Sequence, residues 1–221
     1  MPTTDPAGTP SGPGTRSAYG RDAARYDART AGYDMYRRRA IDALPLAAGD
    51  VVLDVGCGTG LCFEPLLDRI GPAGTVIGVE PAARMRALAA ERIAARGWGN
   101  VRLIGSPVEV AELPTVDHAL FCAVHDVLQS PRALDSVLAH VREGGGVAAT
   151  GGKWAPPWAL LVNVGVLAAH APFVRDFAGF SRPWGPLAER VPGLSVDEVA
   201  WGGGYVAWGT VRRGPRGAPN G

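Results

Sequence analysis

The sequence predicts an α/β fold in which helices cover both faces of a mostly parallel sheet. Short runs of apolar and β-branched residues alternate with longer stretches whose apolar residues recur at helical spacing. Near the end, two β-rich runs are joined by three consecutive glycines at 202–204, a pattern typical of a hairpin. Alternating strands and helices are typical of a doubly wound parallel sheet, and the hairpin makes the last strand antiparallel.

Each element follows from the same patterns in chain order. The expected strands span residues 51–54, 75–79, 101–104, 118–123, 147–150, 194–201 and 205–211. Residues 18–45 are charged, aromatic and alanine-rich, which predicts one or two helices that form a lid over the ligand edge of the sheet. The helix after the first strand contains Leu61 to Ile70, and the helix after the second strand stops at Gly97.

The motif that decides the function is the turn between the first strand and its helix. Asp54 closes the strand, and glycines follow at 56, 58 and 60. A dinucleotide site needs its third glycine three residues after the second, where this chain has Leu61, so the spacing disfavours NAD. Glu80 closes the second strand twenty residues after Gly60, where a carboxylate can hold a ribose diol.

Through the turn from Asp54 to Gly60, through Glu80 and through residues 116–120, residues 20–150 resemble the class I S-adenosylmethionine-dependent methyltransferases. Within that class the chain is most similar to the group containing quinone-biosynthesis and phospholipid methyltransferases. The N-terminal helix of that group often carries paired tyrosines, as Tyr26 and Tyr33 do here. The resemblance implies a Rossmann-like, seven-stranded sheet and S-adenosyl-L-methionine as the cofactor.

The resemblance also implies which residues hold the cofactor. These are Tyr26, Asp54, Gly56, Cys57, Gly58, Gly60, Glu80, Pro81, Met85, Ser106, Val108 and Ala123. Many relatives place an aspartate where Ser106 stands, and a serine hydroxyl offers adenine a weaker, neutral contact. We therefore expect adenine to be held by backbone groups near Val108 and by packing against Met85.

The resemblance implies methyl transfer to an O, N or C atom of a small or amphiphilic acceptor, with natural-product biosynthesis as one setting. Methyl transfer is an in-line displacement, and a base is needed only when the acceptor must lose a proton. His125, directly after the fourth strand, is the candidate catalytic base, and Asp126 either orients its ring or caps the next helix. A His125 that contacts only ligand or backbone remains the alternative, and His170 is the second candidate base.

A long insertion at residues 153–192 is expected on the acceptor side. It contains Trp154, Pro156, Pro157, Trp158, His170, Phe173, Phe177, Phe180 and Trp184. These side chains either line an acceptor pocket or cover the sheet edge. Residues 158–169 are too short to span a bilayer and predict a buried or capping helix.

The composition is that of one ordinary globular domain. The chain has 221 residues, 47% of them hydrophobic and 19% charged, with a net charge of +1, which disfavours nucleic-acid binding. Its three cysteines lack zinc spacing and favour a reducing, cytoplasmic setting, and no metal site is expected. Residues 1–17 and 213–221 are expected to be disordered, leaving 18–212 as the methyltransferase domain.

Several alternatives stay open at this point. The basic run at 37–39 is either a solvated face or a contact to a ligand carboxylate. The chain can be a phospholipid or quinone methyltransferase that docks on a membrane, a methyltransferase-like cyclase that uses the cofactor as a scaffold, or a non-catalytic binding module. The acceptor and the oligomeric state do not follow from the sequence.

Overall fold

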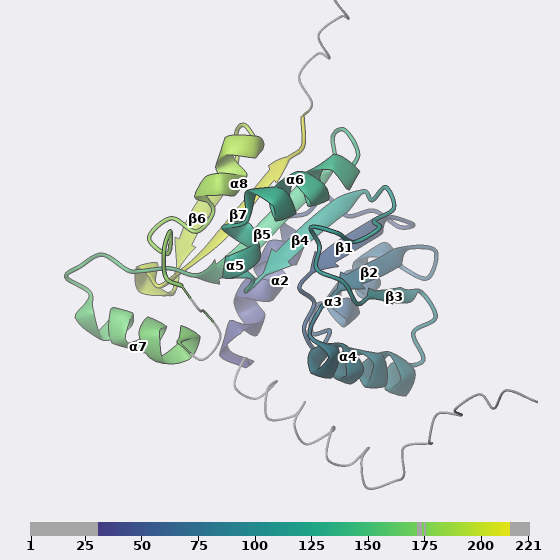
Figure 1. Ribbon diagram of the computed structural model, residues 1–221, viewed down its shortest axis with the longest axis horizontal. Helices are drawn as coiled ribbons and strands as arrows, with labels where there is room; N and C mark the ends of the chain where they lie inside the picture. Colours follow the sequence, from purple (N-terminus) through teal and green to yellow (C-terminus); the bar gives the residue numbers. More distant parts are fainter. Residues whose placement is uncertain (1–30, 172–173, 175, 213–221) are drawn as a thin grey trace, which may run out of the picture.

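The computed structural model describes residues 31–212 except 172, 173 and 175. Over these residues seven strands form one sheet in the order β3-β2-β1-β4-β5-β7-β6 (Figure 1). The strands are β1 Val51–Val55, β2 Thr75–Val79, β3 Val101–Ile104, β4 His118–Cys122, β5 Gly146–Gly152, β6 Ser195–Val199 and β7 Gly204–Thr210. Strands β1 to β5 pair in parallel, and β7 runs antiparallel to both β5 and β6. The predicted seven-stranded, doubly wound architecture is confirmed.

Seven α-helices and two 3-10 turns connect these strands in the described part of the chain. They are η1 Ala31–Tyr33, α2 Asp34–Asp42, α3 Phe63–Ile70, α4 Ala83–Arg96, α5 His125–Leu128, α6 Pro131–His140, α7 Leu160–His170, α8 Gly185–Arg190 and η2 Ala200–Gly202. Local sequence fixes several of their ends. Ser130 caps α6 by accepting a hydrogen bond from the Ala133 amide, and Gly97 ends α4 in the left-handed conformation.

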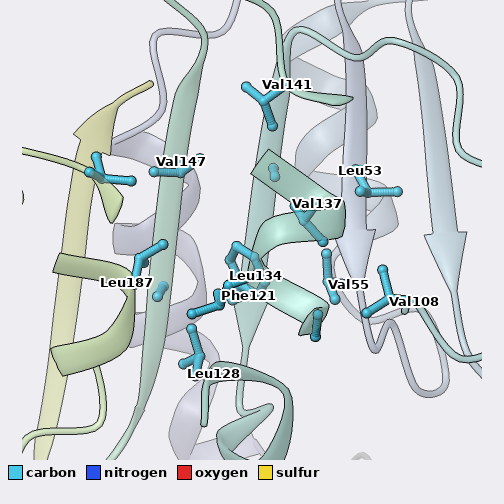
Figure 2. Close-up of a cluster of buried hydrophobic side chains, with 14 of the residues drawn as sticks. Leu53, Val55, Val108, Phe121, Leu128, Leu134, Val137, Val141, Val147 and Leu187 are labelled. Carbon is cyan, nitrogen blue, oxygen red and sulfur yellow. The ribbon is translucent and has the colours of Figure 1, made fainter. Parts of the chain in front are cut away.

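The sheet separates two hydrophobic cores because successive side chains of a strand point to opposite faces. Leu53 and Phe121 lie in the core covered by α5, α6 and α8, which is the cluster drawn in Figure 2. Val52 and Leu120 lie in the core on the opposite face, covered by α2, α3 and α4. Both layers are therefore filled, and function falls to the strand ends and the loops that follow them.

Residues 31–45 of the predicted lid pack on the sheet. Helix α2 contacts β4, β5 and β7, and Ala40 and Ile41 are fully buried in the second core. Tyr26 and the rest of the predicted lid lie outside the described residues, as do Phe173 and the segments 1–17 and 213–221.

Helix α7 differs from its prediction. Its sequence is almost wholly apolar, yet only Val166 is buried, and Leu161 is 89% exposed. The expectation of a buried helix at residues 158–169 is therefore wrong. Figure 1 shows α7 beyond the helices that cover the sheet, so few elements lie close enough to bury its outer face.

Candidate active site

The site is built where the carboxyl ends of β1, β2 and β4 meet. Asp54 of β1 pairs in register with Gly78 of β2 on one side and Leu120 of β4 on the other. The chain then turns through Gly56, Gly58 and Gly60, all with positive φ, before α3 begins. Side chains other than glycine rarely adopt this conformation, which explains the alternating pattern.

The three glycines serve different purposes. A Cβ on Gly56 would strike the Val124 side chain, and one on Gly60 would strike the Phe63 ring. A Cβ on Gly58 would have only the Met85 methyl group near it, at 3.7 Å. Gly56 and Gly60 therefore allow the protein to pack on itself, whereas Gly58 leaves open backbone against which a ligand can lie.

Glu80 joins the glycine turn to the end of β2. One carboxylate oxygen accepts a hydrogen bond from the Gly58 amide at 3.0 Å, and the other accepts from the Ala82 amide at 2.8 Å. Each carboxylate oxygen has two lone pairs, so each retains one for a hydroxyl donor. The side chain is thus held in place with capacity left to bind a diol.

Asp54 is a buried carboxylate whose two oxygens have no hydrogen-bond partner in the described part of the chain. Burial raises the pKa of Asp54 to about 7, and the positive charge of Arg37 acts against that rise. Buried acceptors without partners are costly in a folded protein. The arrangement is suited to a ligand that brings its own donors and positive charge.

Arg37 and Tyr33 lie on the same side of the sheet and add two further buried atoms without partners. Arg37 donates to Asp34 at 2.8 Å through Nη1, while its Nε has no partner among the described residues. The Tyr33 hydroxyl is likewise buried and without a partner there. The solvated-face interpretation of the basic run is therefore wrong for Arg37, which is buried, although Arg38 and Arg39 are exposed.

These atoms fit S-adenosylmethionine, which carries an amino group, a carboxylate and a ribose diol. Asp54 suits the amino group, Arg37 and Tyr33 suit the carboxylate, and Glu80 suits the diol. The open backbone at Gly58 leaves room for the ligand between these groups. The residues present therefore satisfy the demands of this cofactor.

The remaining predicted cofactor residues lie around the same edge. Ala123 leaves β4 with a positive φ of 56°, and its amide donates to the Thr150 carbonyl. Cys57 is buried against Gly78, and burial raises the pKa of its thiol. The Val108 carbonyl accepts a hydrogen bond from the Ser136 hydroxyl at 2.8 Å, so part of the backbone expected to hold adenine is already engaged.

Pro81 and Ser106 follow the ends of β2 and β3. The Pro81 carbonyl accepts a hydrogen bond from Arg86, whose guanidinium packs on Gly105 directly before Ser106. Val124, which closes over Gly56, was missed by the sequence analysis. Its only signal was its place next to His125 after a predicted strand.

His125 begins α5 and faces the insertion between β5 and β6. Its Nε2 lies 3.0 Å from the Ala178 carbonyl oxygen, and its Nδ1 is buried with no partner among the described residues. A carbonyl oxygen only accepts hydrogen bonds, so Nε2 carries the hydrogen and Nδ1 keeps a lone pair. His125 therefore presents a buried hydrogen-bond acceptor at the carboxyl edge.

The insertion places an aromatic cluster beside His125, which we define as His125, Trp154, His170, Phe177 and Phe180. Trp154 stacks on Phe177 at 5.2 Å, and the Phe180 ring meets all four other rings edge-on. Other aromatics of the insertion do not join the cluster. Trp184 packs on Tyr205 in the first core, and Trp158 is exposed.

A groove of about 440 Å³ lies between α3, α4 and the start of α2. Its walls include Leu88, Arg92 and Trp98, and it shares only Gly60 with the predicted cofactor residues. Asp54, Glu80 and His125 do not line it, so the groove is separate from the chemistry described above.

A sheet of this order, with an acid before the glycine turn and a second acid after β2, defines the class I S-adenosylmethionine-dependent methyltransferases. Residues 52–145 match the family described as "Methyltransferase domain". The chain belongs to this class.

Two relatives modify natural products by name. The chain is 40% identical over 86 residues to nocamycin O-methyltransferase of Saccharothrix syringae, covering 38% of this chain and 30% of the relative. It is 30% identical over 100 residues to aklanonic acid methyltransferase DauC of Streptomyces sp. (strain C5), covering 45% and 46%. The matches thus span less than half of either relative.

Solved structures share the fold. One is geranyl diphosphate C-methyltransferase of Streptomyces coelicolor A3(2), solved with S-adenosyl-L-homocysteine, at a TM-score of 0.62 and 15% identity. That match covers 81% of this chain and 76% of the other. A putative methyltransferase in complex with the Haloferax volcanii Trm112 activator gives a TM-score of 0.64 at 14% identity, covering 91% and 97%.

Proposed function

We propose that the chain binds S-adenosylmethionine at the glycine turn and transfers its methyl group to an O, N or C atom of a small or amphiphilic acceptor. The observation that carries the proposal is Asp54, a buried carboxylate with both oxygens unpartnered beside the open backbone of Gly58. The natural-product relatives support a setting in natural-product biosynthesis.

The bound cofactor supplies an electrophilic methyl group on a positively charged sulfur. Asp54 and Glu80 hold its amino group and ribose, and Arg37 with Tyr33 holds its carboxylate. Together they fix the direction of attack, which is the main contribution a protein makes to such a displacement. The surrounding burial excludes water from the reacting atoms.

His125 is the proposed catalytic base for an acceptor that loses a proton, such as a phenol or an enol. Its free Nδ1 accepts the hydroxyl proton, while Nε2 stays bonded to the Ala178 carbonyl and holds the ring in place. His125→Gln retains a donor for that carbonyl and lacks the basic nitrogen. We expect this variant to lose turnover on hydroxyl acceptors with S-adenosylmethionine affinity unchanged, whereas retained turnover would assign His125 to packing.

The first test of the proposed function is calorimetric titration with S-adenosylmethionine, S-adenosylhomocysteine and NAD. We expect the first two to bind and NAD not to bind. Asp54→Ala and Glu80→Ala should each weaken binding more than tenfold, on the order of 1.4 kcal/mol or greater. Unchanged affinity in folded variants would remove the cofactor assignment.

One observation favours a second candidate, a methyltransferase that works on amphiphilic acceptors at a membrane surface. Trp158, Leu161 and Val164 of the α7 region are exposed, as is Trp201. A helix that exposes apolar side chains can dock at the boundary between lipid headgroups and chains. Cosedimentation with phosphatidylcholine vesicles, lost in Leu161→Ser, would support this candidate. Within the described residues no helix has the length and apolarity needed to cross a membrane.

A further inference from the structure

The two histidines of the aromatic cluster contact the same phenylalanine. The ring centroid of Phe180 lies 5.0 Å from that of His125 and 5.5 Å from that of His170. His170 ends α7, and His125 begins α5, so the pair comes from segments 45 residues apart in the sequence. The two imidazoles are close enough to interact electrostatically.

Backbone carbonyls fix opposite tautomers in the two rings. His125 uses Nε2 toward Ala178, whereas His170 uses Nδ1 toward the Val166 carbonyl at 2.9 Å. Because carbonyls only accept, His125 is protonated at Nε2 and His170 at Nδ1. The nitrogens left with lone pairs are Nδ1 of His125 and Nε2 of His170.

The position of His170 depends on a glycine. A Cβ on Gly152, the last residue of β5, would collide with Nε2 of His170. Burial, together with the neighbouring His125, lowers the pKa of His170, so its ring is neutral near pH 7. Nε2 of His170 therefore lies against the end of β5 as a hydrogen-bond acceptor.

The cluster offers a ligand flat apolar walls and no free cation from its neighbour in the chain. Trp154 and Phe177 provide the aromatic surface. Lys153, which precedes Trp154, is held by Glu198 at 3.1 Å and by the Gly202 carbonyl at 3.2 Å. A carboxylate ligand would find no partner there, whereas a ligand with hydroxyl donors would find two lone pairs.

We propose that His170 is a second acceptor-binding residue, and that with His125 it selects a planar aromatic acceptor bearing two hydroxyl groups. The inference rests on the proposed function, because it places the acceptor beside the His125 nitrogen that takes the proton. Each histidine lone pair accepts one hydroxyl, and Trp154 and Phe177 cover the ring face.

The first test measures the tautomers without any reaction. Nitrogen-15 spectra of the imidazole rings, recorded with S-adenosylhomocysteine present, should show the Nε2–H form at His125 and the Nδ1–H form at His170. The opposite tautomer at His170, or a charged ring at pH 7, would overturn the proposal.

The second test compares 1-naphthol with 1,3-, 1,8- and 2,3-dihydroxynaphthalene by calorimetry. At least one diol should bind the S-adenosylhomocysteine complex about tenfold more tightly than 1-naphthol. Titration of that diol should shift the ring nitrogens of both histidines. Equal binding of all four compounds, or no binding of any, overturns the proposal.

His170→Asn supplies the decisive variant, because asparagine keeps a donor for the Val166 carbonyl and lacks the Nε2 lone pair. This variant should bind the preferred diol and 1-naphthol equally. His140→Asn is the matched control, since His140 ends α6 and uses Nδ1 toward the Ser136 carbonyl four residues earlier at 2.8 Å. The control should keep the tenfold preference.

The outcomes separate this inference from the proposed function. A diol preference that survives in His170→Asn removes His170 from the acceptor site while cofactor binding stands. Failure of S-adenosylhomocysteine to bind the wild-type protein removes the proposed function itself, a result read in the earlier titration before any naphthol is added.

Discussion

Asp54 is a carboxylate placed where water does not reach it and where the protein offers its oxygens no donor. Sequence position alone predicted an acid at the end of β1. The structure adds that this acid is a strained group in the cofactor-free protein, since burial raises its pKa from 3.8 to about 7. Such a group stores a preference for a positively charged ligand.

The raised pKa predicts a pH effect on stability. The folded state holds a proton on Asp54 between about pH 4 and pH 7 that the unfolded state releases, so unfolding free energy falls as pH rises through that window. Between pH 5 and pH 8 this group should cost the cofactor-free protein roughly 2–3 kcal/mol. Asp54→Asn cannot ionise and should lack that part of the fall. Urea unfolding of both proteins at the two pH values measures it, and identical pH slopes would contradict the prediction.

Gly58 predicts a separation of cofactor binding from folding. Gly58→Ala places a methyl group on the open backbone and should weaken S-adenosylhomocysteine binding more than tenfold, or about 1.4 kcal/mol. Gly97→Ala is the control, because Gly97 has a similar positive φ and no atoms within 4 Å of its Cβ position. Both variants should lose about 1 kcal/mol of stability, and only the first should lose affinity. Equal affinities would place the ligand elsewhere.

Arg37 shows what residue types alone do not reveal. Three consecutive arginines look alike in the sequence, but helical geometry points them in different directions. Arg37 points to the sheet and lies buried near Asp54, whereas Arg38 and Arg39 are exposed. The sequence predicted Asp54 and Glu80 because strand ends are local features, and it missed Arg37 because its partner lies on another element.

At the scale of elements, the strands were predicted closely and one helix was misjudged. Runs such as residues 75–79 are apolar because both faces of the sheet are covered, so their composition reports their surroundings. The apolar composition of α7 looked the same, but burial also requires an element on the other side. No local pattern distinguishes a helix with a partner from a helix without one.

The two faces of α7 predict opposite responses to the same substitution. Leu161→Ser changes an exposed side chain and should alter the unfolding free energy by less than about 0.5 kcal/mol. Val166→Ser removes buried methyl groups near Gly203 and buries a hydroxyl, and should cost on the order of 2 kcal/mol. Chemical denaturation of the pair tests this, and equal losses would show that the outer face is covered in solution.

At the scale of the whole molecule, ligand and fold should stabilise each other. At pH 8, S-adenosylhomocysteine at 100 times its dissociation constant should add about 2.7 kcal/mol to the unfolding free energy. That corresponds to a rise in Tm of roughly 5–10 °C. At pH 6 most Asp54 is protonated in the free protein, so the same concentration should raise Tm less. Thermal scans at both pH values check the prediction, and a larger rise at pH 6 would contradict it.

The whole fold was predictable because its signals repeat along the chain, strand after strand. The acceptor side was not, because it depends on contacts between distant segments. The hydrogen bond from His125 to Ala178 spans 53 residues, and the encounter of His125 with Phe180 spans a similar distance. Sequence analysis identified His125 and listed the aromatic residues, but left open which of them meet.

The position of β7 has a consequence for how the protein is made. β7 is the last strand in the chain but lies inside the sheet, between β5 and β6. While a ribosome is still synthesising residues 204–210, β5 has an open edge and β6 has nowhere to pair. Unpaired edges invite association with other chains. Nascent chains stalled before Gly204 should therefore depend on chaperones, and those released after Thr210 should not.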